Sequence, residues 1–225
     1  MHSTLAKRAI AEWQKAPYDK DYFQCGTLIL SSTTHSAAQY VNASLALNQQ
    51  GAIPLHTPCE VQNCFPSTVP RKGEFTHQTA YLNQNCGYAT ARSAMDSLCD
   101  RVRTAGARFL QGRATRIIYD TPTSPTDSDQ DISKRKVVGI ELASGETLLD
   151  FDFFVVAAGA WTGQLVPELD RDLVASGQIV GTIQLTEEEA TAYKGCPVVF
   201  AMDTGFYVFP VSLRCAPSLF TWRSD

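Results

Sequence analysis

Residues 153–163, FFVVAAGAWTG, are the part of this sequence best suited by residue type to contact a cofactor. The apolar residues from Phe153 to Ala158 predict a central strand that is covered on both faces of a sheet. Small residues follow at 157–160, and at the end of a strand they let a flat or charged ligand approach the backbone. The same small residues also suit close packing of a helix on a sheet, so both interpretations stay open.

The residues after this segment predict a helix from Thr162 to Leu169, with Thr162 as its N-cap. The first N–H groups of such a helix have no partner within it. They would face the end of the predicted strand, where they suit a phosphate or a flavin oxygen.

Other catalytic signatures are missing from the sequence. It contains no GxSxG turn, no Walker A loop and no GxGxxG fingerprint, which argues against a serine hydrolase, a P-loop enzyme and a self-contained dinucleotide-binding fold. Seven cysteines form no CxxC pair, and four histidines fall on separate segments. We therefore expect no metal site.

Composition places the chain among ordinary globular proteins. Its 225 residues are 44% hydrophobic and 19% charged with a formal net charge of −4, which fits one large domain or two small ones and argues against nucleic-acid binding. The longest strongly apolar run, residues 153–161, is far shorter than the roughly 20 residues of a membrane-spanning helix. The amino-terminal residues do not have the pattern of a signal peptide, so we expect an intracellular protein, cytoplasmic by default.

Hydrophobic periodicity predicts the elements that must position these residues. Helices are expected over residues 5–13, 38–49 and 89–105, with another begun by a capping box at Thr186. Strands are expected over residues 22–30 with a break at Gly26, and over 108–112, 114–119 and 178–185. Hairpins are expected around residues 143–145 and 203–205, and an irregular connection over 52–75. The middle of the chain therefore has an α/β pattern, whereas the last part has an antiparallel one.

Several segments, in this order, resemble one enzyme family. They are LAKRAIAEW at 5–13, YFQCGTLIL at 22–30, the stretch 85–112, DFDFFVVAAGAWTGQLVPEL at 150–169 and the stretch 177–210 that ends in FYVFP. Together they are similar to the FAD-dependent amine oxidases of the sarcosine oxidase and fructosyl amino acid oxidase family, in its fungal form.

This resemblance implies a mixed α/β fold. An FAD-binding domain of the D-amino-acid-oxidase and glutathione-reductase-like type is interleaved along the chain with a substrate domain built on an antiparallel sheet. The implied boundaries are residues 1–26 for a remnant of the FAD domain, 27–85 for the first part of the substrate domain, 86–175 for the middle of the FAD domain, and 176–225 for the second part of the substrate domain, with a diverged tail at 211–225.

The resemblance also implies a reaction. Family members oxidise the C–N bond of a secondary amine, with FAD taking a hydride equivalent and oxygen then giving hydrogen peroxide. Sarcosine, pipecolate or a fructosyl amino acid is the implied substrate. The alternative is a non-catalytic fragment that binds at most a small molecule or a protein partner.

Carried over position by position, the resemblance implies two groups of site residues and no catalytic residue. Ala114 would meet the adenine end of FAD, and the pyrophosphate and ribityl region would lie along Ala157, Ala158, Gly159, Ala160 and Trp161. Tyr207 takes the place of a tyrosine that faces the substrate above the flavin. Its alternative role is that of a strand aromatic packed on the sheet.

The sequence also departs from the family pattern. The family opens with a strand, a GxGxxG turn and a helix, and this sequence contains no such opening. The family also has a lysine that promotes oxygen reduction, and Ser218 lies near the position where that lysine would fall. Cys215 has no matching context for flavin attachment. We therefore expect the chain to be incomplete, to carry little FAD and to be inactive by itself. Many relatives are peroxisomal, but the terminus Arg223-Ser224-Asp225 is not an SKL-type signal.

The segment from Asp120 to Lys136 gives a first testable prediction. It is rich in Pro, Ser, Thr and Asp and has too few apolar residues to bury itself, so we expect a surface loop. Limited proteolysis with a protease of broad specificity should cut here before any other internal site. Mass spectrometry of the first fragments checks this, and an earlier cut elsewhere would contradict it.

Overall fold

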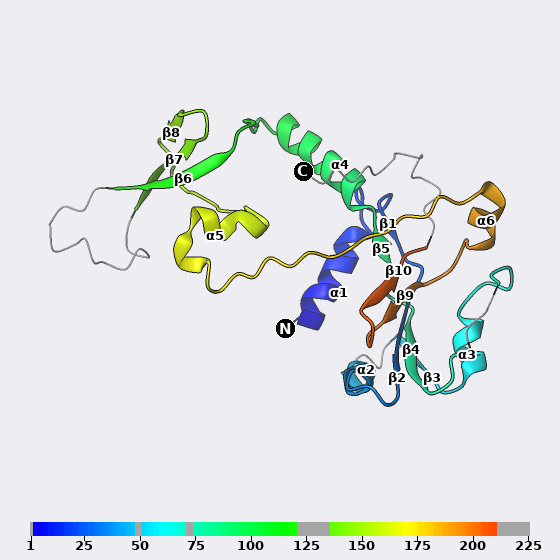
Figure 1. Cartoon of the computed structure of the whole chain (residues 1–225). Coiled ribbons are helices and arrows are strands. Elements are labelled where there is room, and N and C mark those ends of the chain that lie inside the picture. Colours follow the sequence, from blue (N-terminus) through cyan, green and yellow to red (C-terminus); the bar gives the residue numbers. More distant parts are fainter. Residues whose placement is uncertain (1, 48–50, 71–73, 121–135, 211–225) are drawn as a thin grey trace. The chain divides into compact units, whose positions relative to one another are not determined.

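The computed structural model describes residues 2–47, 51–70, 74–120 and 136–210 (Figure 1). The chain divides into two compact units, the first formed by Met1–Gly106 with Thr182–Asp225 and the second by Ala107–Gly181. The described elements of the first unit are α1 (His2–Trp13), β1 (Tyr22–Phe23), β2 (Thr27–Ser32), α2 (Ala38–Leu47), β3 (Ala52–Leu55), α3 (Pro58–Asn63), β4 (Gln78–Asn83), β5 (Tyr88–Ala89), α4 (Ala91–Thr104), α6 (Glu187–Ala192), β9 (Val198–Ala201) and β10 (Phe206–Val208). Those of the second are β6 (Ala114–Tyr119), β7 (Val137–Leu142), β8 (Thr147–Leu149), the 3-10 turn η3 (Gly159–Trp161), α5 (Thr162–Leu165) and the 3-10 turn η4 (Pro167–Leu169).

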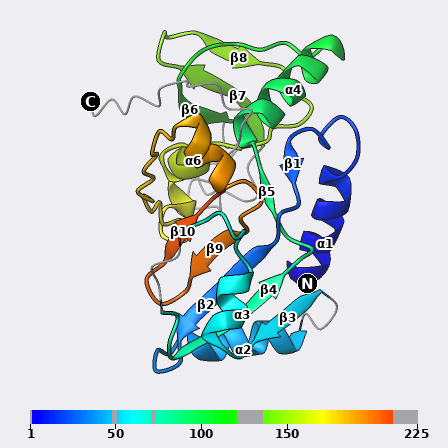
Figure 2. The ribbon, with the colours of Figure 1, turned by 90° about the vertical axis from the view of Figure 1, so that its right-hand side faces the viewer.

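A five-stranded mixed sheet organises the first unit. Its strand order is β10-β9-β2-β4-β3, with β10 at one edge and β3 at the other (Figure 2). β2 pairs antiparallel with β4 and parallel with β9, while β9 and β10 form an antiparallel hairpin. The central strand is therefore joined to a strand from a distant part of the chain.

The two faces of this sheet bury different side chains. Leu28 and Leu30 of β2 cluster with Ala80 of β4 and Val61 of α3, whereas Tyr81 clusters with residues of α2 and β3 on the other face. Successive residues of a strand point to opposite faces, so the apolar run LIL in β2 supplies both clusters. This is why a strand without polar alternation lies in the middle of the sheet.

Glycines allow a close crossing before β2. Gly26 has φ +80°, which separates β1 from β2 at the break that the sequence predicts. A Cβ on Gly87 would overlap the carbonyl oxygen of Phe23, because the backbones of β1 and β5 run in contact there. A larger residue at position 87 is thus incompatible with this pairing.

Most of the predicted elements of the first unit are confirmed. α1, α2 and α4 lie at the positions of predicted helices, and Gly106 at φ +93° follows the end of α4. α4 begins two residues later than predicted, because Ala89 belongs to β5, and residues 48–49 of the second predicted helix lie outside the described residues. The capping box at Thr186 is present: its side chain accepts from the N–H of Glu189, and the Glu189 carboxylate accepts from the N–H of Thr186. The hairpin around 203–205 is β9–β10.

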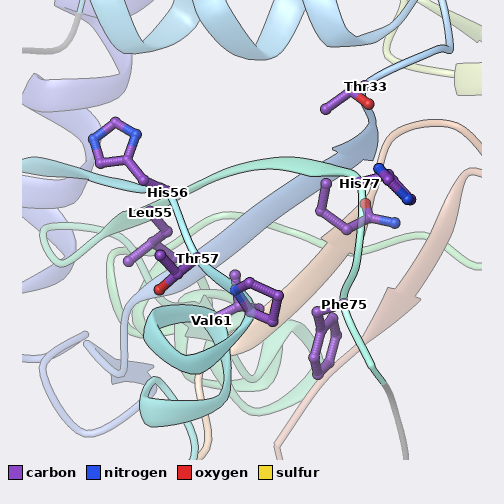
Figure 3. Close-up of a pocket in the computed structure, with 9 residues that line it drawn as sticks. Thr33, Leu55, His56, Thr57, Val61, Phe75 and His77 are labelled. Atoms are coloured by element: carbon purple, nitrogen blue, oxygen red, sulfur yellow. The ribbon is translucent and has the colours of Figure 1, made fainter.

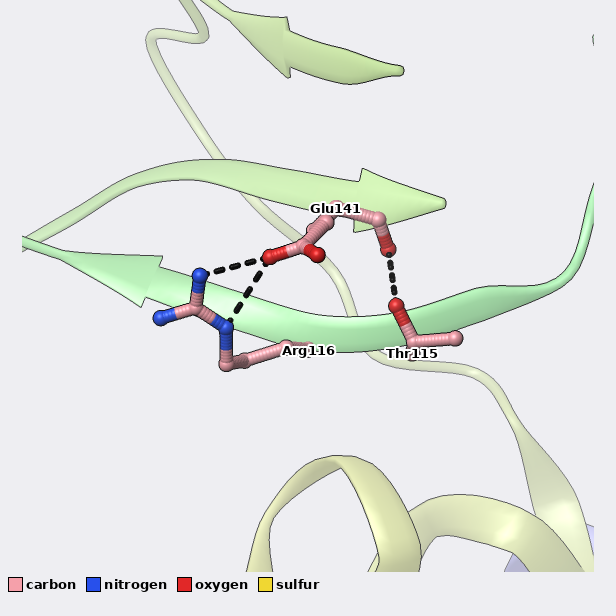
Figure 4. Close-up of polar contacts among 3 residues, drawn as sticks. All are labelled: Thr115, Arg116 and Glu141. Atoms are coloured by element: carbon pink, nitrogen blue, oxygen red, sulfur yellow. Dashed lines mark hydrogen bonds and ion pairs between the residues drawn. The ribbon is translucent and has the colours of Figure 1, made fainter. Parts of the chain in front are cut away.

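The second unit contains a three-stranded antiparallel sheet of order β6-β7-β8. Gly145, at φ +85°, turns the predicted hairpin from β7 into β8. On the exposed surface, the Arg116 guanidinium donates to one carboxylate oxygen of Glu141 at 2.6 and 3.0 Å, and Thr115 donates to the Glu141 carbonyl at 3.1 Å (Figure 4). These contacts join β6 to β7.

The prediction of a buried central strand over Phe153 to Ala158 is wrong. The segment has no strand geometry, and Phe153 and Val155 are 91% and 83% exposed. Its residue types suit a covered strand, but a strand also needs a neighbour for its backbone hydrogen bonds. No strand in the described part of the chain pairs with this segment.

The strands predicted over 108–112 and 178–185 are absent for the same reason, and Ile179 and Ile183 are almost fully exposed. The predicted irregular connection over 52–75 instead contains β3 and α3, and β4 follows it. The capping box of Thr57 and Glu60 begins α3, with Pro58 at its first turn.

The helix predicted over Thr162 to Leu169 is also shorter than expected. α5 has a single turn, begins after Trp161 rather than after Thr162, and η4 follows it; Pro167 cannot donate the hydrogen bond that would continue the helix. Residues 121–135 of the predicted surface loop lie outside the described residues. Among the helices that the structure describes, none is long and apolar enough to cross a bilayer.

Leu28 gives a test of this core. Its side chain is 0% exposed between β4 and β9, so Leu28→Ala should lower the free energy of unfolding by about 3 kcal/mol through lost burial and a cavity. Leu47→Ala is the matched control, since Leu47 is 82% exposed at the end of α2, and should change it by less than about 0.5 kcal/mol. Urea denaturation measures both, and equal effects would contradict the assignment of Leu28 to the core.

Candidate functional site

The small-residue segment of the second unit presents its backbone to solvent. Ala157, Gly159, Ala160 and Trp161 are exposed and Ala158 is half-buried. Gly159 has φ +55° and opens η3, in which the N–H of Trp161 donates to the Ala158 carbonyl at 3.0 Å. The chain therefore turns sharply here with only methyl groups or hydrogen as side chains before the indole ring.

This segment has room for a flat group against its backbone. A Cβ built on Gly159 meets no heavy atom within 4 Å, and the Trp161 ring is 65% exposed beside it. Bulky side chains would fill such a surface, whereas alanine and glycine keep it open. The residues present thus fit an extended cofactor with aromatic and phosphate parts.

Ala114 lies at the start of β6, opposite Leu142 of β7, and is half-buried. The turn of helix that follows the small-residue segment, α5, contacts β6 within the same unit. The structure thus brings the end of the small-residue segment to the strand that begins with Ala114.

Tyr207 belongs to the first unit, on the edge strand β10. Its ring stacks on that of Phe200, the residue directly opposite on β9, with centroids 4.2 Å apart and an interplanar angle of 8°. The side chain remains 49% exposed. Tyr207 therefore combines a ring packed on the sheet with solvent access, and the contact with Phe200 fits the alternative role of a strand aromatic.

A second group of aromatic rings lies near the end of β10. Tyr88 stacks on Phe23 at 5.1 Å across the β1–β5 pair, and its ring meets Phe209 edge-to-face at 6.4 Å. Phe209 is 61% exposed. Residues 207 and 209 thus carry aromatic rings with solvent access at the edge of the sheet.

The first unit also contains an open pocket of about 250 Å³ that the sequence did not reveal. His56 and His77 lie on opposite sides of it (Figure 3), and Val61 and Phe75 are among the apolar lining residues. Two of the lining residues, Phe75 and His77, have positive φ, at +48° and +57°. No sequence signal pointed to these residues, since neither a glycine nor a motif marks the turn.

The Glu60 carboxylate beside this pocket caps the start of α3. The N–H groups of His56 and Thr57 donate to the Glu60 carboxylate and lower the pKa of Glu60. Among the described residues, no group of three or more histidine, cysteine, aspartate or glutamate side chains is arranged to hold a metal ion.

The family model for DAO, described as FAD dependent oxidoreductase, matches residues 2–216 of this chain. The chain belongs to this family. The match spans both units, so one family accounts for the small-residue segment and for the sheet that carries Tyr207.

Known proteins agree with this assignment. L-saccharopine oxidase of Schizosaccharomyces pombe is 28% identical over 213 residues, which cover 92% of this chain and 48% of that protein. The chain therefore spans about half the length of the curated relative it matches. Mixed sheets and helices of this kind occur in the DAO family, and the predicted mixed α/β fold is confirmed.

Solved structures show the same fold. Fructosamine oxidase (Amadoriase II) from Aspergillus fumigatus, in complex with FSA, matches with a TM-score of 0.72 at 21% identity. The match covers 94% of this chain and 46% of the fructosamine oxidase chain. Amadoriase I from the same organism has a TM-score of 0.66 at 21% identity, with coverage of 89% and 43%. At such identities the likeness establishes the fold, and the resemblance to fructosyl amino acid oxidases is supported.

Proposed function

We propose that this protein takes part in the FAD-dependent oxidation of the C–N bond of a secondary-amine amino acid, with oxygen as electron acceptor and hydrogen peroxide as product. The observation that carries the proposal is the family match over residues 2–216. Sarcosine, pipecolate and fructosyl amino acids are the candidate substrates, and the relative named L-saccharopine oxidase adds saccharopine to them.

The cofactor would lie against the second unit. Ala157, Ala158, Gly159, Ala160 and Trp161 offer an open backbone surface for its pyrophosphate and ribityl region, and Ala114 is proposed to meet its adenine end. When bound, FAD supplies the hydride acceptor for amine oxidation. The role of these residues is to position it and to keep bulky side chains out of its path.

Tyr207 is proposed to contact the substrate from the first unit. The stack on Phe200 orients the ring, and the side chain is 49% exposed, so its hydroxyl can donate a hydrogen bond to a substrate carboxylate. Such a bond orients the amino acid without taking part in electron transfer.

The proposed division into domains has support in the sheets. Strands from residues 27–83 and from 198–208 share the five-stranded sheet, as expected for two parts of one substrate domain at 27–85 and 176–225. The pair β1–β5 joins residues 22–23 to residues 88–89, which lie just outside the two ends of the proposed part at 27–85. The assignment of 1–26 and 86–175 to an FAD domain stays a prediction.

A peroxide assay separates the oxidase from the binding module. The chain is saturated with FAD, and each candidate secondary amine is added under air, with the corresponding primary amino acid as control. Peroxide formed only with secondary amines would support the oxidase and show that the expected inactivity of the isolated chain is wrong. Binding of FAD or amine without turnover would favour the non-catalytic alternative. Absence of FAD binding would agree with the missing GxGxxG unit and show that Ala114 and residues 157–161 do not hold the cofactor by themselves.

Ala157→Leu tests the cofactor surface. The new side chain projects from an exposed position, so it should leave folding unchanged while it blocks the backbone and weakens FAD binding by about tenfold or more. Ala143→Leu, at an exposed turn of the same unit, is the matched control. Flavin fluorescence titration measures both affinities, and equal affinities would remove residue 157 from the site.

Tyr207→Phe tests the substrate contact. Loss of one hydrogen bond to a carboxylate should raise the KM or Kd for the amino acid by about tenfold. The variant should change the affinity for the amide of the same substrate by a smaller factor, because a hydrogen bond to a neutral carbonyl is weaker than one to a carboxylate. Tyr40→Phe, on an exposed tyrosine of α2, controls for loss of a hydroxyl as such. An unchanged affinity for the carboxylate would leave Tyr207 as a packing residue only.

A further inference from the structure

Two cysteines far apart in the sequence lie beside each other at the start of the β2–β9 ladder. Thr27 is paired with Val198 at the first position of this parallel ladder, and Cys25 and Cys196 each lie two residues before the paired residue of their segment. The N–H of Val198 donates to the carbonyl of Gly26 at 3.0 Å, which holds the two backbones together next to both cysteines. The Cys25 thiol donates to the same Gly26 carbonyl at 3.5 Å, so the Cys25 side chain lies beside the residues that lead into β9.

The ladder brings the two segments that carry these cysteines close together. Neighbouring strands such as β2 and β9 lie about 4.8 Å apart, and the Cα atoms of a disulfide are usually about 4.4–6.8 Å apart, so the spacing at Thr27 and Val198 is within the range of a disulfide. Both thiols are free in the structure. Burial and, after it, the negative charge of Cys25 raise the pKa of Cys196, which agrees with a short distance between the two thiols.

We propose that Cys25 and Cys196 are a redox pair that hydrogen peroxide converts into a disulfide between β2 and the β9–β10 hairpin. This modification does not depend on the proposed amine oxidation, because the peroxide can come from any source. Its effect is a covalent link between the central strand and the hairpin that carries Tyr207.

Accessibility decides which thiol reacts first. Cys25 is half-buried, whereas Cys196 is only 7% exposed, so peroxide reaches Cys25. The Cys25 thiolate attacks one peroxide oxygen: an S–O bond forms, the O–O bond breaks, and the leaving hydroxide takes up a proton as water. The Cys196 sulfur then attacks the sulfenic sulfur; an S–S bond forms, the S–O bond breaks, and hydroxide leaves with the Cys196 proton as a second water. Two thiols lose two electrons, and the peroxide is reduced to two waters.

The surroundings of Cys25 make this reaction dependent on pH. Burial raises the pKa of Cys25, and the hydrogen bond from the Val198 backbone opposes that rise in part. The ionisable groups whose pKa values respond to Cys25 are Tyr22 and Cys196, and Cys86 also acts on Tyr22. Because the thiolate is the reactive form, the rate should rise about tenfold per pH unit between pH 7 and pH 8.5.

Peptide mapping of the whole chain tests the proposal. The folded protein is treated with hydrogen peroxide at pH 8, free thiols are alkylated, and the digest is analysed by mass spectrometry without reduction. The expected main cross-link joins the peptides of Cys25 and Cys196 and disappears after dithiothreitol treatment. A link from Cys25 to any other cysteine, or irreversible oxidation of the exposed Cys59 while Cys25 stays a thiol, would overturn it.

Variants separate the two steps. In Cys196→Ser, Cys25 should accumulate as a sulfenic acid that a cyclic 1,3-diketone traps, and no cross-link should form. Cys59→Ser is the matched control and should cross-link as the unmodified chain does, since Cys59 is exposed on α3. Should Cys196→Ser fail to fold, the pH dependence of cross-linking in the unmodified chain still decides: a rate that does not rise with pH would contradict attack by the Cys25 thiolate.

Discussion

The parallel pairing of β2 with β9 is the contact on which the first unit depends. It joins residues 27–30 to residues 198–201, and it places β2 in the middle of a sheet that is covered on both faces. Without this pairing, one edge of β2 would have no strand partner, and the β9–β10 hairpin that carries Tyr207 would not belong to the sheet. The proximity of Cys25 to Cys196 follows from the same pairing.

Apolar sequence without a backbone partner behaves differently in the second unit. Residues 153–156 are as hydrophobic as those of β2, yet Phe153 and Val155 are exposed, because hydrophobicity places a strand in a sheet only where another strand offers hydrogen bonds. The exposed segment that results, together with Gly159 and its alanine neighbours, is the surface that we propose for the cofactor.

Aromatic contacts link packing to the proposed chemistry in the first unit. Phe200 supports the Tyr207 ring across the hairpin, and Tyr88 joins Phe209 to Phe23. A stacked ring has less rotational freedom than a free side chain. Less conformational entropy is therefore lost when its hydroxyl binds a ligand. The same contact therefore serves the fold and the proposed substrate site.

The sequence by itself determined the local elements and the family. The periodicity of α4, the capping box at Thr186 and the glycine at 145 each act over a few residues, so they could be predicted, and the motifs around 150–169 and 177–210 identified the family. Only the tertiary structure decided which apolar segments became strands, that β9 runs parallel to β2, and that Phe200 faces Tyr207. These features depend on partners distant in the chain, and the pattern of residues along one segment carries no information about its partner.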